Sequence, residues 1–233
     1  MTHIGILLCD DHRPYAIKRF GTYDNHFKAM LAEEEQAQQK CSVWRCFEGN
    51  FPVSAKQCDS WIISGSKWGV YDSDSWIKTL RAFIQNLDEI KTNVVGICFG
   101  HQIIHDALGG QVAKSEKGWG IGAYPVKVYE QLGSIAPGDS LKLLAIHQDQ
   151  VQSMAYGFTH IAGCSFTPYA ITRKGSHILT FQAHPEFNDG FYQDLCENIR
   201  EKLGREALKK VKATRGQPDD RQIIRQVIRD FLL

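Results

Sequence analysis

The 233-residue sequence has no long apolar run, no excess of one charge and no paired cysteine motif. A helix needs roughly 20 apolar residues to cross a bilayer, and no run approaches that length. Residues 1–5 also lack the basic and then apolar order of a signal peptide. These absences argue against a membrane protein and a secreted one, so we expect a cytoplasmic protein with no membrane partner.

Acidic and basic side chains nearly cancel, at 26 against 27. No long-range field would therefore collect nucleic acid on the surface, and a small-molecule substrate is the better expectation. The seven cysteines form no CxxC pair, and their odd number in a reducing compartment indicates free thiols. Most are expected to act as small apolar core residues, but one of the seven needs a different explanation.

The first hundred residues alternate between short apolar runs and segments with helical spacing of apolar residues. The expected strands are 4–9, 41–46, 61–63 and 93–97, and the expected helices are 23–31 and 76–87. Strands that are apolar on both faces and alternate with helices indicate an α/β fold. We predict a doubly wound, mostly parallel open sheet with helices on both faces.

The second half is richer in strands and should extend the same sheet. Strand-like segments separated by turn residues lie near 121–129, 141–146, 159–164, 169–173 and 177–182. Two helices are expected to follow, near 189–203 and 220–232, with a linker at 215–219 between them. We interpret residues 1–233 as a single domain in which 204–233 is a C-terminal helical extension.

Residues 96–100, Gly-Ile-Cys-Phe-Gly, join the strand at 93–97 to a helical stretch that begins near His101. This is the pattern of a nucleophile elbow, in which glycines allow a tight turn that exposes the central side chain. A helix N-terminus at that position favours the thiolate form of Cys98. The alternative, a buried structural thiol in a glycine-rich turn, is about equally compatible with these five residues taken alone.

A second segment favours a catalytic Cys98 over a structural one. His184, Pro185 and Glu186 follow the strand-like segment at 177–182. A cysteine nucleophile needs a base, and the base needs a third group that fixes its tautomer. We therefore predict that Cys98 is the nucleophile, His184 the base and Glu186 the residue that orients the base.

Acyl transfer also requires hydrogen-bond donors for the tetrahedral oxyanion. The N–H group of Phe99, one residue after the nucleophile, is the first candidate. The second is the turn Ser64, Gly65 and Ser66 after the strand at 61–63, although an ordinary β-to-α turn would have the same composition.

These motifs resemble the triad-type, class I glutamine amidotransferases, and most of all the free-standing relatives of the GMP synthase amidotransferase domain. The motifs are Gly-Ile-Cys-Phe-Gly-His-Gln at 96–102, His-Pro-Glu at 184–186, Ile-Ser-Gly-Ser at 63–66 and His-Gln-Asp-Gln-Val at 147–151. The resemblance covers roughly residues 3–200 and implies the flavodoxin-like amidotransferase fold.

The resemblance implies that Cys98 attacks the side-chain amide of glutamine to form a γ-glutamyl thioester, with release of ammonia and then glutamate. It further implies that Gln102 and Asp149 bind the amino-acid end of glutamine, while Gly65, Ser66 and the Phe99 N–H form the oxyanion hole. Two features depart from the family pattern. Ser66 stands where a second glycine is common, and only about thirty residues follow residue 203, so an ammonia-accepting synthetase would have to be a separate protein.

Four hypotheses stay open on the sequence. The first is a glutaminase or amidotransferase, and the second is a γ-glutamyl peptidase that acts on glutathione-like conjugates with the same triad. The third is a catalytically silent regulatory module, and the fourth is a cysteine peptidase or chaperone in which histidine follows the elbow cysteine, where this chain has Phe99. No cofactor or metal site is expected, because His101 and His105 have no third ligand at a suitable spacing.

Overall fold

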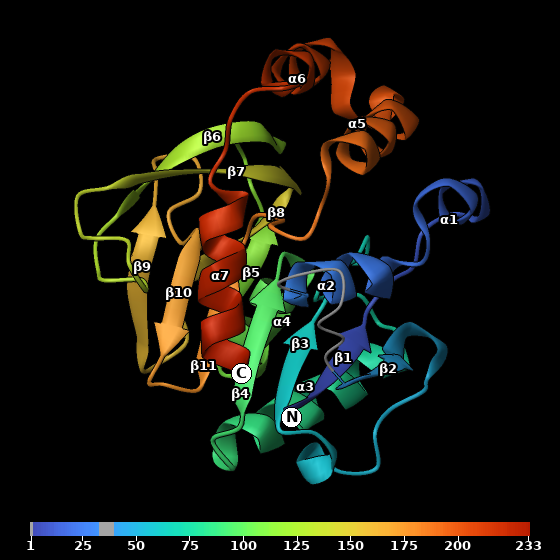
Figure 1. The fold of residues 1–233 in the computed structure, drawn as a ribbon, viewed down its shortest axis with the longest axis vertical. Coiled ribbons are helices and arrows are strands. Elements are labelled where there is room, and N and C mark those ends of the chain that lie inside the picture. The colour runs from blue at the N-terminus through green and yellow to red at the C-terminus, as the bar shows by residue number, and fades with distance from the viewer. Residues whose placement is uncertain (1, 33–39) are drawn as a thin grey trace.

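The computed structural model describes residues 2–32 and 40–233, and its described part is built around one mixed sheet of nine strands (Figure 1). The strand order is β2-β1-β3-β4-β11-β10-β9-β6-β7. The strands are β1 (His3–Leu8), β2 (Lys40–Arg45), β3 (Ser60–Ile63), β4 (Asn93–Ile97), β6 (Gly120–Val128), β7 (Ser140–His147), β9 (Phe158–Gly163), β10 (Ile171–Lys174) and β11 (Ile178–Phe181).

Five neighbouring strands, from β2 to β11, run parallel, and the four from β10 to β7 are antiparallel. The parallel half has the order 2-1-3-4-5 of flavodoxin-like sheets when β11 is counted as its fifth strand. The predicted fold class is therefore confirmed, and the β-rich second half extends the sheet as expected. All five parallel strands end at the same edge, which is where such folds bind ligands.

The side chains of β1 divide between two apolar clusters, one on each face of the sheet. Ile4, Ile6 and Leu8 join the first cluster, and Leu7 joins the second. Successive side chains of a strand point to opposite faces, so a strand covered on both sides must be apolar throughout. This explains why the opening run of the sequence shows no alternation of apolar and polar residues.

Helices cover both faces of the sheet, as Figure 1 shows. α2 (Tyr23–Leu31) and α7 (Arg221–Leu232) pack into the first cluster, and α3 (Ser75–Glu89) and α4 (Phe99–Ala107) pack into the second. α3 buries its apolar residues at the predicted helical spacing. The structure also contains two 3₁₀ turns, η1 (Cys46–Glu48) and η2 (Ala55–Gln57).

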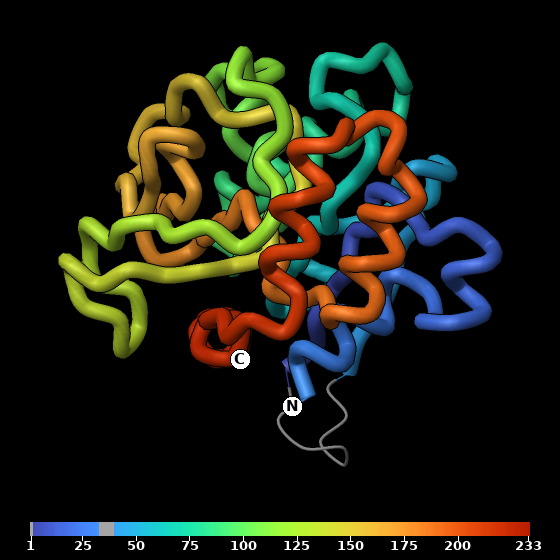
Figure 2. The backbone as a smooth tube through the Cα atoms, turned by 90° about the horizontal axis from the view of Figure 1, so that it is seen from above, coloured from blue at the N-terminus to red at the C-terminus, as the bar shows by residue number. Residues whose placement is uncertain are grey.

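The sequence prediction of one helix near 189–203 is wrong. α5 (Asp189–Asn198) ends before Ile199, which has φ −108° and ψ 15°, and α6 (Arg200–Thr214) follows at once. α6 is itself kinked at Gly204, whose φ of 76° is left-handed. Seen from above in Figure 2, α7 is viewed along its axis, whereas α5 and α6 extend across the molecule. In Figure 1 they stand above the carboxyl ends of the parallel strands.

Three further elements were not predicted. They are α1 (Pro14–Phe20), β5 (Gln111–Lys114) and β8 (Asp149–Ser153), and the last two pair with each other outside the main sheet. None of the helices in residues 2–32 and 40–233 combines the length and the apolar character needed to cross a membrane.

Candidate active site

Cys98 lies at the apex of the sharp turn between β4 and α4. Its backbone has φ 52° and ψ −102°, a strained conformation for a residue other than glycine. The turn needs glycine on both sides: a Cβ on Gly100 would lie 2.2 Å from the carbonyl oxygen of Ile63, and one on Gly96 would lie 2.7 Å from the carbonyl oxygen of Gly100. The local sequence thus produces the strand-to-helix turn that was predicted, with Cys98 at its centre.

His184 follows β11 and is held on three sides. Its backbone N–H donates to the carbonyl oxygen of Leu144 at 2.8 Å. Its ring stacks on Phe187, with centroids 4.2 Å apart and an interplanar angle of 5°. Nδ1 lies 2.7 Å from Oε1 of Glu186, and the imidazole and Cys98 both lie beside Gly65. The structure therefore brings together the three residues that the sequence assigned to one catalytic group.

The protonation of His184 reflects two opposing influences. Complete burial lowers its pKa, but the charge of Glu186, together with the interactions with Cys98 and Glu186, raises the pKa to about 10. An imidazolium held between a carboxylate and a sulfur atom can give its proton to a leaving amine. Because Nδ1 donates to Glu186, Nε2 is the ring nitrogen left without a bond to that carboxylate.

Tyr23 is a contributor to this group that the sequence did not reveal. Its hydroxyl donates to Oε1 of Glu186 at 2.8 Å, across 163 residues of chain. The other carboxylate oxygen, Oε2, is buried and has no hydrogen-bond partner in the described part of the chain. Tyr23 and His184 therefore both bind the same oxygen of Glu186 and fix the carboxylate between them. Helical spacing identified Tyr23 only as a core residue, since nothing local to α2 indicates its partner.

The turn after β3 lies against the same group. A Cβ on Gly65 would come within 2.8 Å of the Tyr23 hydroxyl, 3.0 Å of Cε1 of His184 and 3.6 Å of the Cβ of Cys98. Only a glycine leaves room for this approach. The serines on either side bind Cys9, the residue after β1: the Ser64 hydroxyl accepts from the Cys9 N–H at 2.9 Å, and the Ser66 hydroxyl donates to the Cys9 carbonyl at 2.8 Å.

Gln102 and Asp149, the predicted contacts for the amino-acid end of glutamine, lie next to each other. The amide of Gln102 donates to the backbone carbonyl of Asp149 at 2.8 Å and to Oε1 of Gln182 at 3.1 Å. The Asp149 carboxylate hydrogen bonds with Tyr71. Burial raises its pKa more than the hydrogen bond from Tyr71 and the charge of Lys114 lower it. Asp149 is the first residue of β8, an element absent from the sequence prediction.

A pocket of about 780 Å³ contains most of these groups. Cys98, His184, Gly65, Ser66, Gln102 and Asp149 all line it. Phe99 and Glu186 do not: Phe99 is buried at the start of α4, and Glu186, 2% exposed, lies behind His184. The pocket volume falls in the upper part of the range of about 300 to 1,000 Å³ that is usual for small-molecule sites.

His101 and His105 of α4 are buried and do not line the pocket. Nδ1 of His101 and Nε2 of His105 each hydrogen bond with a threonine hydroxyl, of Thr180 at 2.7 Å and of Thr172 at 2.8 Å. Both rings are fully buried, and burial lowers the pKa of both. Among the residues that the structure describes, no group of three His, Cys, Asp or Glu side chains is placed to hold a metal ion.

Comparison with known proteins identifies the family. The family model for class-I glutamine amidotransferases matches residues 22–199, which include Cys98, His184 and Glu186. The chain belongs to this family. A protein of Saccharomyces cerevisiae that carries a glutamine amidotransferase designation is 31% identical over 98% of this chain and 97% of its own length.

Two further groups of relatives differ in what their names describe. Gamma-glutamyl peptidase 5 of Arabidopsis thaliana is 27% identical over 93% of this chain and 90% of its own length. The glutamine-hydrolyzing GMP synthase of Nitratiruptor is 28% identical over 82% of this chain but only 37% of its own length. Among solved structures, a glutamine amidotransferase of Methylobacillus flagellatus superposes with a TM-score of 0.76 at 19% identity and supports the fold.

Proposed function

We propose that this protein hydrolyses γ-glutamyl amide bonds through a thioester on Cys98. The observation that carries the proposal is the arrangement of three side chains: Cys98 on a strained elbow, His184 beside it around Gly65, and Glu186 2.7 Å from Nδ1 of His184. A nucleophile, a base and a residue that orients the base, in contact and at the edge of a pocket, are the requirements of acyl transfer.

The reaction would begin with attack of the Cys98 sulfur on the γ-carbonyl carbon of the substrate. The carbonyl oxygen becomes an oxyanion, for which the Phe99 N–H and the turn at Gly65 and Ser66 are the proposed donors. As the carbon–nitrogen bond breaks, His184 passes its proton to the leaving nitrogen. Neutral His184 then takes a proton from water, which attacks the thioester and releases glutamate.

Gln102 and Asp149 are proposed to bind the amino-acid end of the substrate. Asp149 lines the same pocket as Cys98 and presents a carboxylate suited to an α-ammonium group. Lys114 also lines the pocket and is the cross-strand neighbour of Asp149 between β5 and β8, so we propose that it pairs with the α-carboxylate. Opposite charges on these two side chains match the two charged groups of a free γ-glutamyl unit.

Glutamine is the first candidate substrate, with ammonia as the product. The ammonia would be free or would pass to a separate synthetase, as the alignment with one part of a longer GMP synthase suggests. A γ-glutamyl peptide is the second candidate. The pocket of about 780 Å³ favours it, because glutamine alone would leave much of this volume unfilled, and the Arabidopsis relatives are named as γ-glutamyl peptidases.

The test is a parallel assay of glutamine and of γ-glutamyl dipeptides with the purified protein. We expect release of ammonia or of the free amino acid, trapping of a γ-glutamyl enzyme by mass spectrometry, and loss of both in Cys98→Ala. Cys41→Ala is a matched control, since Cys41 is a half-buried free thiol on β2 that does not line the pocket. Absence of hydrolysis of every γ-glutamyl compound, or full activity in Cys98→Ala, would contradict the proposal.

A further inference from the structure

The pocket continues from the catalytic residues into a groove that the proposed glutamine contacts do not use. α1 and the loop before it form one side of this groove, and α5 with the start of α6 forms the other. Its lining residues are Arg13, Ala16, Phe191, Leu195, Ile199 and Lys202. We call the part of the pocket that these six residues line the α1–α5 groove. An ion pair between Arg19 and Asp194, with 3.1 Å between nitrogen and oxygen, connects the two sides.

The position of His184 shows which part of a substrate the groove would receive. His184 protonates the leaving nitrogen in the proposed mechanism, so the leaving group must depart on the side of its imidazole. Phe187 stacks on that imidazole at 4.2 Å, and Phe191 of α5 follows with its ring 4.8 Å from Phe187. The groove therefore continues from His184, whereas Gln102 and Asp149 belong to the proposed γ-glutamyl side.

One wall of the groove is apolar. Phe191, Leu195 and Ile199 follow one another at intervals of four residues, which places them on the same face of α5 and its end. Phe191 is fully buried, while Leu195 and Ile199 are half-buried and leave apolar surface within the pocket. Ala16 of α1 is also apolar and lines the pocket with them. A side chain of matching size would be shielded from water there.

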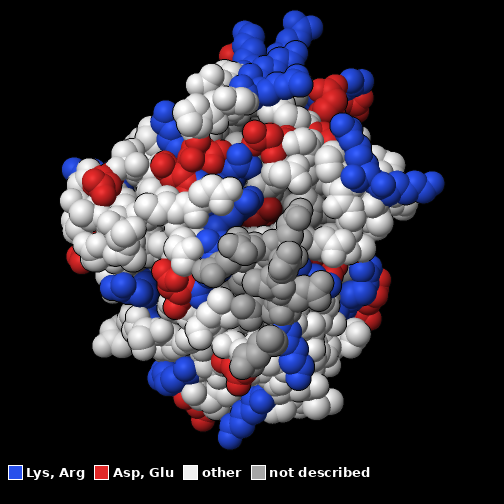
Figure 3. Space-filling view, viewed as in Figure 1, with Lys and Arg blue, Asp and Glu red and all other residues white. Residues whose placement is uncertain are grey.

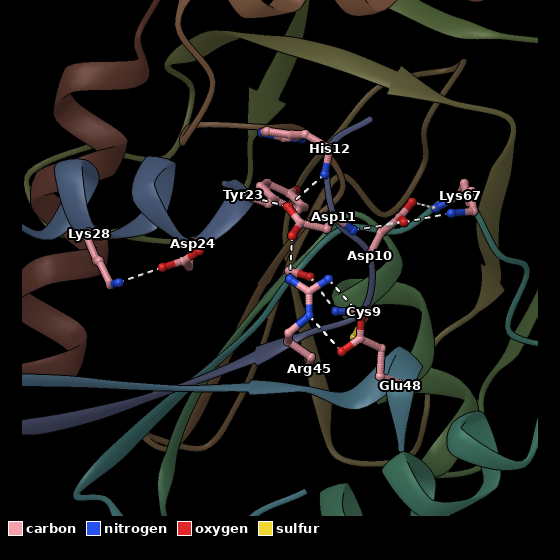
Figure 4. Close-up of polar contacts among 11 residues, drawn as sticks. Cys9, Asp10, Asp11, His12, Tyr23, Asp24, Lys28, Arg45, Glu48 and Lys67 are labelled. Carbon is pink, nitrogen blue, oxygen red and sulfur yellow. Dashed lines mark hydrogen bonds and ion pairs between the residues drawn. The ribbon is translucent and has the colours of Figure 1, made fainter. Parts of the chain in front are cut away.

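The acidic residues around the groove are already paired, and its unpaired charges are basic. Figure 4 shows the loop after β1, where Asp10 binds Lys67 and Asp11 binds Arg45. Asp194 is neutralised by Arg19. By contrast, Arg13 and Lys202 have no ion-pair partner within residues 2–32 and 40–233. Figure 3 shows acidic and basic side chains on the same face of the molecule.

From these observations we propose that the α1–α5 groove is a leaving-group subsite for a bulky apolar amino acid with a free carboxylate. This inference rests on the proposed hydrolysis and specifies its substrate: a γ-glutamyl dipeptide whose second residue is apolar. Its side chain would lie against Leu195 and Ile199, and its carboxylate would face Arg13 and Lys202. In the step itself the carbon–sulfur bond of the thioester forms, the carbon–nitrogen bond breaks, and His184 supplies the proton that makes the amino acid a neutral leaving amine.

The apolar wall is tested by the ratio of kcat/KM for γ-glutamylleucine to that for γ-glutamylglycine. We expect the ratio to be about 10 to 100 in the wild-type protein, the range for added apolar groups in a fitting pocket. Leu195→Ser should lower it towards unity. Equal rates for the two dipeptides would overturn the inference and leave the proposed hydrolysis standing, whereas cleavage of neither, nor of glutamine, would refute the proposed function itself.

The basic residues are tested with γ-glutamylleucine and its C-terminal amide. We expect Lys202→Glu, a change at an exposed position on α6, to reduce the preference for the free acid about tenfold. Lys210→Glu is the matched control: it makes the same charge change at an exposed position on the same helix, away from the pocket. An unchanged preference in Lys202→Glu, or an equal loss in both variants, would overturn the role given to this charge.

Discussion

Replacement of Glu186 by glutamine tests the proposed role of this residue beside His184. The two side chains of the His184–Glu186 pair are 5% and 0% exposed and lie 2.7 Å apart. Removal of one charge from a buried pair typically costs about 3 to 5 kcal/mol. If that energy supports the imidazolium in the transition state, kcat/KM should fall by roughly 10² to 10⁴.

The pH dependence gives a second, independent readout of the same substitution. Glu186 is the strongest influence that raises the pKa of His184, and burial opposes it. Without the carboxylate charge, burial dominates and the pKa of His184 should fall from about 10. We therefore expect the alkaline limb of the kcat/KM profile to move to lower pH in Glu186→Gln.

The assay is steady-state hydrolysis of the best γ-glutamyl substrate from pH 5 to pH 10.5, with folding checked by thermal unfolding. Glu206→Gln is the control, because its ion pair with Lys209 is on the surface, with side chains 81% and 74% exposed, and such pairs contribute little. A loss of less than tenfold in Glu186→Gln, or an alkaline limb that stays in place, would refute the assignment of Glu186 as the partner that charges His184.

Three further predictions concern residues around this group. Tyr23→Phe removes one of the hydrogen bonds to the Glu186 carboxylate, and kcat/KM should fall about 10- to 100-fold with KM little changed; an unaltered kcat would contradict this. Gly65→Ala places a methyl group 3.0 Å from Cε1 of His184 and should lower kcat/KM at least about tenfold; wild-type kinetics would show that the ring is free to move. His105 has a pKa near 3 when folded and 6.5 as its ordinary value, so the unfolded state binds more protons between these values. The contribution of His105 to the free energy of unfolding is complete above pH 6.5 and is lost as pH falls, by up to about 1.4 kcal/mol per pH unit. Urea unfolding from pH 7 to pH 4 should show this slope in the free energy of unfolding, and His105→Gln should reduce the slope.

The elbow could be predicted from sequence because its cause is local. Gly96 and Gly100 flank Cys98 within five residues, and the close approaches at both glycines show why no other residue type fits. The segment that carries His184 and Glu186 is equally short. The parallel half of the sheet was predictable for a related reason, since buried strands must be apolar on both faces.

Contacts between distant segments could not be predicted in this way. Tyr23 meets Glu186 only because α2 packs on β1, and no pattern within α2 distinguishes this tyrosine from the other buried residues of the helix. The break between α5 and α6 is another case. No proline marks this break at Ile199, and Gly204, which kinks α6, lies five residues after it. The apolar residues therefore keep a helical spacing through Ile199, and the sequence indicates one continuous helix. β8 was missed because it is short and polar.

An aromatic cluster connects His184, the proposed base, with Phe191 of the α1–α5 groove. Phe187 stacks on His184, Phe191 packs against Phe187, and the ring of His12 lies 4.1 Å from Phe191. A leaving group in the groove would therefore press on the residues that orient the imidazole. If the leaving-group subsite is correct, a fitting amino acid should raise kcat as well as lower KM, because it holds His184 in line with the departing nitrogen. An effect on KM alone would mean that the groove binds the substrate without assisting proton transfer.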